Sequence, residues 1–263
     1  MNSFQNIKVS VITPTYNDEQ FISETINSVL NQTHQNLELI IIDDCSTDNT
    51  RLLISKIKDS RLRFIKNKSN FGPAYCRNLG IKESRGEYIA FLDGDDVWEP
   101  TKIENQLTFM VQNSYDFCYS NFEWINEKSE KIGVLKTGPK VVTKKMFKKS
   151  DYIGCLTAIY KKSIYPDLRI PEDIYKRNDY ALWLLLSQKC DCYLLDETLA
   201  YYRKRESSVS SKKKSHLFKY HVVLYQKLFN YKTLTAFYYS IINVFYYFIR
   251  KLKYTKRYTI TKK

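Results

Sequence analysis

The sequence predicts an α/β fold in which helices flank a mostly parallel central sheet. Four strand candidates begin near Val9, Leu37, Leu62 and Tyr88. Their starts lie 28, 25 and 26 residues apart, which leaves room for one helix and two loops each time. The apolar runs at 39–42 and 88–92 are continuous, a pattern typical of strands that are buried on both faces of a parallel sheet.

Helical patterns occupy the connections between these strands. In residues 21–30 the apolar side chains fall on one helical face, and Asn17 or Asp18 is available to cap the start of that helix. A second helix is expected to open at Ser46. A third is expected to open at Pro73, because a proline loses no hydrogen bond in the first helical turn.

After a further helix that follows Pro100, the pattern changes to shorter strands. These are expected at residues 117–120, 156–160, 193–195 and 199–203, with one helix around 180–188. The Lys-rich stretch 126–149 contains two glycines and a proline, which predicts a mobile loop or a hairpin over the site.

Net charge is distributed unevenly along the 263 residues, which together carry +14. Residues 1–202 hold 26 Lys and Arg against 27 Asp and Glu, whereas residues 203–263 hold 16 against one. A nucleic-acid-binding protein would interleave aromatic and basic residues, but here the aromatic residues form a separate uncharged block. We therefore expect no nucleic-acid partner and keep such a protein only as an alternative.

The cysteines and the N-terminus bear on the compartment. The six cysteines include no CxxC pair and have no histidine at zinc-binding spacing, which favours reduced thiols over disulfides or a zinc site. The first residues lack the apolar stretch of a secretory signal. The main part of the chain is therefore expected to face the cytoplasm.

Two acidic turns follow predicted strands. Asp43-Asp44 comes directly after the second strand, and Asp93-Gly94-Asp95-Asp96 comes after the fourth. Open α/β sheets bind ligands beyond the carboxyl ends of their strands. Carboxylates that converge there repel one another unless a cation or a ring of donors lies among them. The turns therefore predict a nucleotide site with a metal ion.

Five segments, in order over residues 9–186, carry a family resemblance: VSVITPTYN, IIDDCSTDNT, SNFGPAYCRNLGI, FLDGDD and NDYALWLLL. Together they resemble the inverting family 2 glycosyltransferases, which have the Rossmann-like A-type glycosyltransferase fold. The likeness is to bacterial enzymes of O-antigen, lipopolysaccharide and capsule polysaccharide biosynthesis. It implies transfer of a sugar from a nucleotide diphosphate.

The resemblance assigns roles to the second acidic turn. It places Asp93 near the nucleotide ribose and the metal, makes Asp95 the metal ligand, and leaves Asp96 as an assisting neighbour. The cofactor would be a divalent cation, Mn²⁺ or Mg²⁺, which neutralises charge on the departing diphosphate. The alternative is that these residues only form a turn.

The first acidic turn resembles the family's nucleobase site. There Asp44 would accept a hydrogen bond from the base, with Pro14 and Tyr16 against the ring, which favours a uridine donor. Asn70 and Arg77 resemble residues that border the nucleotide pocket. Alternatively, Asp44 caps the helix near residue 46 and Arg77 is an ordinary surface arginine.

The remaining roles fall in the second half. Asp179 resembles the general base that deprotonates the acceptor hydroxyl, although Asn178 stands where the family has Glu. Asp173 is the competing carboxylate. Arg203 lies in a segment that resembles the family's flexible strap over the diphosphate. The Gln-x-x-Arg-Trp element of processive relatives is absent, which implies one sugar per encounter.

The tail contains an uncharged aromatic block from Leu234 to Ile249, bounded by basic residues. Sixteen residues are slightly short for a transmembrane span, and tyrosine prefers the membrane interface. We expect a basic, aromatic, helical and amphipathic tail that lies on the anionic cytoplasmic face of the inner (plasma) membrane, as a peripheral attachment. A true span and a helix packed on the catalytic domain are the alternatives.

Together these inferences predict a metal-dependent inverting hexosyltransferase. We expect a nucleotide-sugar-binding half at 1–113, an acceptor-binding half at 114–203 and a membrane-associating tail at 204–263. The donor would be a UDP-sugar and the acceptor a polyprenyl-diphosphate-linked saccharide, and the specific reaction expected is a β-1,3 hexosyl transfer. A sugar-nucleotide nucleotidylyltransferase is the rival enzyme, but it would need a glycine-rich phosphate loop, and TPTYNDE contains no glycine.

Overall fold

The computed structural model describes residues 4–174, 176–205 and 217–260. Four parallel strands form its first half: β1 (Val9–Thr15), β2 (Leu37–Asp43), β3 (Leu62–Lys66) and β4 (Tyr88–Phe91). β2 and β4 are buried throughout, as their continuous apolar runs predicted, and β1 is buried throughout as well. The sequence-based positions of these strands are confirmed.

Four helices connect and flank these strands: α1 (Ile22–Leu30), α2 (Thr50–Lys56), α3 (Pro73–Glu83) and α4 (Lys102–Asn113). Pro73 opens α3 as predicted. The second helix begins later than predicted, at Thr50 rather than Ser46. The reason is local, because the Asp48 carboxylate accepts a hydrogen bond from the Thr50 backbone N–H at 2.9 Å and so ends the turn before the helix.

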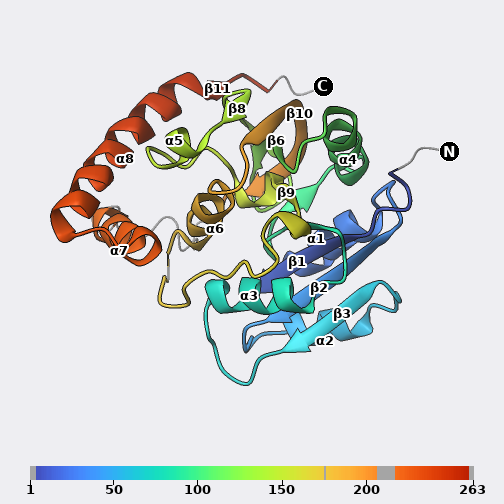
Figure 1. Cartoon of the computed structure of the whole chain (residues 1–263). Coiled ribbons are helices and arrows are strands. Elements are labelled where there is room, and N and C mark those ends of the chain that lie inside the picture. Colours follow the sequence, from blue (N-terminus) through green and yellow to red (C-terminus); the bar gives the residue numbers. More distant parts are fainter. Residues whose placement is uncertain (1–3, 175, 206–216, 261–263) are drawn as a thin grey trace.

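The second half extends the same sheet with short strands: β5 (Val97–Trp98), β6 (Phe117–Ile125), β7 (Lys131–Lys136), β8 (Val141–Val142), β9 (Ile159–Lys161) and β10 (Cys192–Arg203). The main path runs β11-β7-β6-β9-β4-β1-β2-β3, and β10 pairs with β5, β6 and β8. β9 is antiparallel to both β4 and β6. The two halves therefore share one continuous sheet (Figure 1).

Two predictions in this half need correction, and the hairpin expected in the Lys-rich stretch is present. The strands expected at 193–195 and 199–203 are one strand, β10, which stays paired with β6 through register shifts between 195 and 200. The strand expected at 156–160 begins only at Ile159, because residues 155–157 form a 3₁₀ turn. The stretch 126–149 contains the β6–β7 hairpin, β8 and the short helix α5 (Lys144–Phe147).

The chain ends in α7 (Leu217–Phe229), α8 (Thr233–Lys253) and β11 (Thr255–Arg257), and these elements belong to the same body. Helix α6 (Asn178–Leu186) lies between α7 and the sheet (Figure 1). β11 pairs antiparallel with β7, so the tail returns to the sheet. Within the described part of the chain, no helix has the length and apolarity needed to cross a membrane.

The core lies on both faces of the sheet. One cluster gathers side chains from α3, α5, α6 and α7, and the other gathers side chains from α1 and α4. All six cysteines are free thiols, as predicted. The Lys102 ammonium is among the charged groups buried in the described residues; it donates to Gln106 at 2.5 Å and lies 4.0 Å from the centre of the Trp98 ring.

Lys102 predicts a pH dependence of stability. Burial lowers its pKa to about 7, whereas an unfolded lysine titrates at about 10.4. Between these values the unfolded chain binds more protons, so this group makes the free energy of unfolding rise with pH by up to about 1.4 kcal/mol per unit. Lys102→Met should remove that slope in urea unfolding at pH 7 and pH 9.5. The exposed control Lys82→Met should keep it, and equal slopes in both variants would contradict the assignment.

Candidate functional site

The two acidic turns meet at the carboxyl ends of β1, β2 and β4, close to the N-terminus of α6. Helix α1 holds the second turn in place, because the Thr25 hydroxyl donates to the carbonyl oxygens of Gly94 at 3.0 Å and Asp96 at 2.8 Å. A Cβ atom at Gly94 would lie 2.5 Å from an Asp18 carboxylate oxygen and 2.8 Å from the Thr15 hydroxyl. The turn therefore requires glycine at this position, so that the chain can approach β1 closely.

Asp18 belongs to this centre, which the sequence reading missed. The Asp18 side chain does not cap α1; instead, Oδ2 accepts hydrogen bonds from the Thr15 hydroxyl at 2.9 Å and the Tyr16 N–H at 3.2 Å. Its other oxygen faces Arg205 at 2.7 Å. A signal was available, because Asp18 follows the end of a buried strand just as the two acidic turns do.

Arg205 joins two of the acids. Its Nη1 atom lies 2.7 Å from Asp18 Oδ1 and 2.9 Å from Asp95 Oδ2. Burial raises the pKa of Asp95 to about 6, the negative charges of Asp18 and Asp93 raise it as well, and Arg205 opposes them. These carboxylates therefore repel one another, and the guanidinium stands where positive charge is needed.

Asp95 and Asp18 present hard oxygen donors of the kind that a divalent cation binds, and Mg²⁺ commonly takes one or two protein carboxylates together with substrate phosphates. The described residues contain no group of three or more His, Cys, Asp or Glu side chains arranged as metal ligands. The donor set fits a cation that is held jointly by protein and diphosphate. It does not fit an all-protein cage.

Arg77 links the acidic turn to α6. This buried guanidinium donates from Nη1 to the Asn178 side-chain oxygen and from Nη2 to Asp93 Oδ1. Partial burial and the nearby charge of Asp179 raise the pKa of Asp93, whereas Arg77 lowers it. The structure also explains why an amide suits position 178. The neutral Asn178 side chain accepts a hydrogen bond from Arg77 without neutralising the guanidinium, whose positive charge stays available to Asp93. Arg77 is thus not a surface arginine.

Asp179 lies in the first turn of α6, half-buried, with one oxygen accepting the Tyr180 N–H at 2.8 Å. Arg177, in the left-handed conformation at φ 65°, precedes the helix and pairs with buried Asp151 at 3.6 Å. Burial raises the pKa of Asp151 to about 6, and the charge of Asp179 adds to that rise. Asp173 lies outside this group, since it is half-exposed and pairs with Lys227 at 2.6 Å.

The first acidic turn is organised by Asp44, although not as a cap for the helix near residue 46. Its Oδ1 accepts from Asn67 Nδ2 and from the Phe71 N–H, both at 2.9 Å, and its Oδ2 accepts from the Gly72 N–H at 2.7 Å. Asp44 thereby fixes the turn before α3, and it is the neighbouring Asp43 that accepts from the N–H of Ser46.

The other predicted nucleotide residues lie around this turn. Pro14 is buried in β1, while the Tyr16 ring at its end is 47% exposed and open to a partner. Asn70 is exposed. Asn67, not singled out from the sequence, makes the contact to Asp44 instead. No local pattern marks Asn67, because the contact depends on the packing of β3 beside β2.

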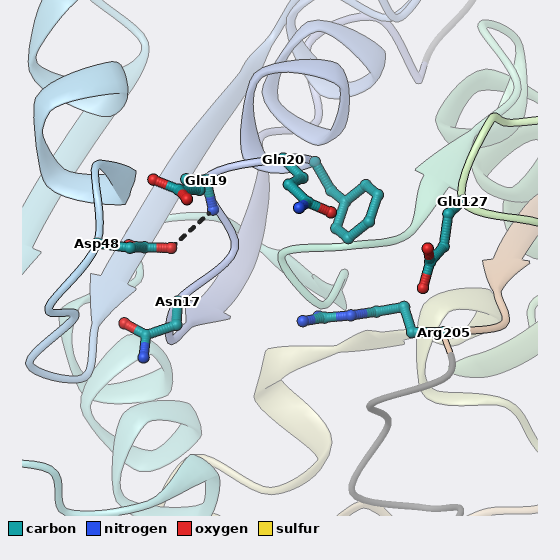
Figure 2. Close-up of a pocket in the computed structure, with 7 residues that line it drawn as sticks. Asn17, Glu19, Gln20, Asp48, Glu127 and Arg205 are labelled. Carbon is teal, nitrogen blue, oxygen red and sulfur yellow. Dashed lines mark hydrogen bonds between the residues drawn. The ribbon is translucent and has the colours of Figure 1, made fainter.

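Arg203 and Arg205 differ sharply in position. The Arg203 side chain is fully buried and donates to the Asp95 carbonyl at 2.8 Å and to Glu24 at 2.6 Å. Arg205, two residues later, has a partly exposed side chain that points toward Asn17 across a small polar concavity (Figure 2). This concavity is lined by Asn17, Glu19, Gln20, Phe21, Asp48, Glu127 and Arg205. Of the two arginines, Arg205 presents its charge to the acidic centre.

Comparison with known proteins identifies this arrangement. The family model described as "Glycosyl transferase family 2" matches residues 10–167, a span that includes both acidic turns. The chain belongs to glycosyl transferase family 2. It is 40% identical over 217 residues to WfaP and 37% identical over 207 residues to WfgD, both of Escherichia coli and both described as "UDP-Glc:alpha-D-GlcNAc-diphosphoundecaprenol beta-1,3-glucosyltransferase".

These family 2 alignments cover 82% of this chain and 85% of WfaP, and 78% and 80% for WfgD. Among solved structures, S. aureus TarS 1–349 in complex with UDP matches with a TM-score of 0.67 at 22% identity, over 88% of this chain and 68% of that one. The predicted fold, a Rossmann-like A-type glycosyltransferase fold, is confirmed. The predicted resemblance to bacterial glycosyltransferases is confirmed by these relatives.

Arg77→Gln tests the link between the two halves of the site. Removal of the guanidinium leaves Asp93 without its counter-charge, so we expect a loss of roughly 2 kcal/mol in the free energy of unfolding. This is less than for a fully buried pair, because the Asp93 side chain is 38% exposed.

Arg169→Gln is the matched control, since Arg169 is 73% exposed and pairs with Glu172 on the surface. It should change the free energy of unfolding by at most about 0.5 kcal/mol. Denaturant unfolding of both variants provides the comparison. Equal effects would show that Arg77 does not join the halves.

Proposed function

We propose that this family 2 glycosyltransferase moves a hexosyl group from a UDP-sugar to a hydroxyl of a polyprenyl-diphosphate-linked saccharide, with inversion at the anomeric carbon. The activity by which WfaP and WfgD are named supports this substrate class, and a β-1,3 linkage is the specific form of the proposal. The TarS complex supports a uridine nucleotide.

One observation carries the proposal: Arg77 joins Asp93 of the diphosphate-side turn to Asn178, the neighbour of Asp179. This fixes a carboxylate base and an acidic turn on facing sides of one site. A single displacement needs that arrangement, with the nucleophile activated on one face of the sugar and the leaving group held on the other.

The residues that follow β1 and β2 form the proposed binding region for the donor nucleotide. The exposed Tyr16 ring offers a stacking surface, and the turn that Asp44 holds through Phe71 and Gly72 borders it. We assign the uracil to this region, with Pro14 beneath the ring and Asn70 at its border. We assign the diphosphate contact expected of Arg203 to Arg205, because its charge already lies among the acids.

Asp95 and Asp18 would hold a divalent cation, Mn²⁺ or Mg²⁺, with Asp93 beside them. When bound, such a cation neutralises negative charge on the departing diphosphate. The chain itself supplies positive charge at the same place through Arg205. Arg77 contributes by forming an ion pair with Asp93.

Asp179 provides the base. Its carboxylate takes the proton of the acceptor hydroxyl while that oxygen forms a bond to the anomeric carbon. The bond between the anomeric carbon and the diphosphate oxygen breaks on the opposite face, and UDP leaves with the electron pair. One carboxylate suffices because no covalent sugar–enzyme intermediate forms. UDP release measured across several UDP-sugars, with and without acceptor and manganese, tests the reaction as a whole.

Asp95→Asn tests the diphosphate side. We expect it to abolish transfer and to remove the manganese-dependent part of UDP binding in calorimetry, because an amide is a poor ligand for a hard cation. Asp116→Asn is the control. Asp116 directly precedes β6 and lies at the amino end of the sheet's parallel strands, opposite to the acidic turns at their carboxyl ends. Near-normal turnover of the Asp95 variant in limiting manganese would show that the metal assignment is wrong.

Asp179→Asn separates chemistry from binding. The rate of transfer should fall by roughly 100-fold or more, the usual effect of removing a positioned base. UDP-sugar affinity should stay within a few-fold of wild type, because this side chain faces the acceptor. Single-turnover rates and donor titrations supply the two measurements.

Asp173→Asn removes the same charge from the competing carboxylate, which is half-exposed and paired with Lys227. It should remain active. If Asp173→Asn is inactive while Asp179→Asn turns over, the general base is Asp173 and not Asp179. Loss of donor binding in the Asp179 variant would instead place that residue in the nucleotide site.

A further inference from the structure

Helix α8 presents an apolar face to solvent. Of the sixteen large hydrophobic side chains that are exposed in the described residues, ten lie on this helix. Six of them, spaced alternately by four and three residues, are Leu234, Tyr238, Ile241, Phe245, Phe248 and Leu252. That spacing places them along one side of an α-helix, so they form a single stripe, which we call the α8 stripe.

The opposite side of α8 is fixed to the catalytic domain. Ala236, Ser240 and Asn243 are buried there, also at spacings of four and three. The Asn243 amide donates to the Tyr180 hydroxyl at 2.9 Å and to the Tyr225 hydroxyl at 3.2 Å, so it joins α8 to α6 and α7. With this face held, the α8 stripe points outward. Helix α8 itself lies on the side of the molecule away from β3 and α2 (Figure 1).

The surroundings of the stripe are positively charged. Residues 217–260 contain eight Lys and Arg and no Asp or Glu. Lys232 precedes the helix, and Lys251 and Lys253 are exposed in its last turn. Aromatic and aliphatic residues flanked by lysines match the boundary between acyl chains and anionic head groups. A second copy of the chain is a poorer partner, because it would bring two positive surfaces together.

The geometry also favours a helix that lies in the plane of a membrane. The uncharged part of α8 runs from Thr233 to Ile249, roughly 25 Å of helix, which is shorter than the roughly 30 Å hydrocarbon core. Asn243 lies within that stretch, and its amide donates to Tyr180 on α6 and to Tyr225 on α7. A spanning helix would have to release these contacts into lipid.

We propose that the α8 stripe docks on an anionic lipid bilayer and inserts its aromatic and aliphatic side chains at the head-group boundary. The docking proposal deepens the proposed function. It rests on that function in one respect, because it takes the acceptor to be anchored in the same bilayer. The contact from Asn243 reaches Tyr180, the residue next to Asp179. Docking through α8 therefore sets the position of the base-bearing helix relative to the membrane surface.

The test uses full-length protein and needs no substrate. Protein is mixed with phosphatidylglycerol vesicles or with phosphatidylcholine vesicles, and the fraction that floats with lipid is measured. The triple variant Tyr238→Ser, Phe245→Ser, Phe248→Ser removes the centre of the stripe at positions that are about 60% exposed. The control variant Leu52→Ser, Val111→Ser removes exposed apolar side chains from α2 and α4.

We expect wild type and the control to float with phosphatidylglycerol at least about tenfold better than with phosphatidylcholine. The triple variant should lose at least about tenfold of that binding and keep its UDP-sugar affinity, which shows that the fold is intact. It should also keep transfer to a water-soluble acceptor that lacks the polyprenyl chain. If no transfer occurs in any variant while flotation behaves as stated, the proposed function fails and the docking surface stands.

Equal flotation of wild type and triple variant would overturn the proposal, and so would the absence of flotation in wild type. Sedimentation equilibrium gives a further outcome. A wild-type dimer that the triple variant dissociates, without vesicle binding, would identify the stripe as a contact between copies of the chain.

Discussion

Carboxylates that collect at the carboxyl ends of parallel strands repel one another, and the site described above depends on how that repulsion is balanced. Asp18 comes from the loop after β1, whereas Asp93 and Asp95 come from the turn after β4, and burial and neighbouring negative charge raise the pKa of Asp93 and Asp95. Arg77 supplies positive charge from α3, and Arg205 supplies it from beyond β10. These balancing charges lie on segments far apart in the sequence. The stability of the acidic site therefore depends on the same contacts that join the two halves of the sheet.

The sequence predicted what depends on local composition. Apolar runs and the regular spacing of the strand candidates identified β1 to β4, and Pro73 marked the start of α3. It did not reveal Asn67 or Arg205, because their contacts to Asp44 and Asp95 join residues 23 and 110 positions apart. Asp18 could have been found by the rule that identified the two acidic turns, but its position before a helix made a capping role look sufficient.

The tail shows a different limit of sequence reasoning. Hydropathy along residues 234–249 reports a stretch without charge, and it does not say which side of the helix is covered. The answer comes from Ser240 and Asn243, small and polar residues that mark the buried side of α8. The sequence left two expectations for this region, a helix on the membrane surface and a helix packed on the domain. They describe opposite faces of α8, because one face packs on the domain and we propose a membrane surface for the other.

The pairing of β11 with β7 ties the end of the chain to the sheet that carries the chemistry. Without residues 255–257, β7 would become an edge strand with unpaired backbone groups, which is a template for aggregation. During synthesis on the ribosome, β7 is complete at Lys136 and β11 begins only at Thr255, so the outer edge of β7 stays uncovered until almost the whole chain has been made. A protein shortened at its C-terminus would lose solubility for this reason alone, whatever its affinity for lipid.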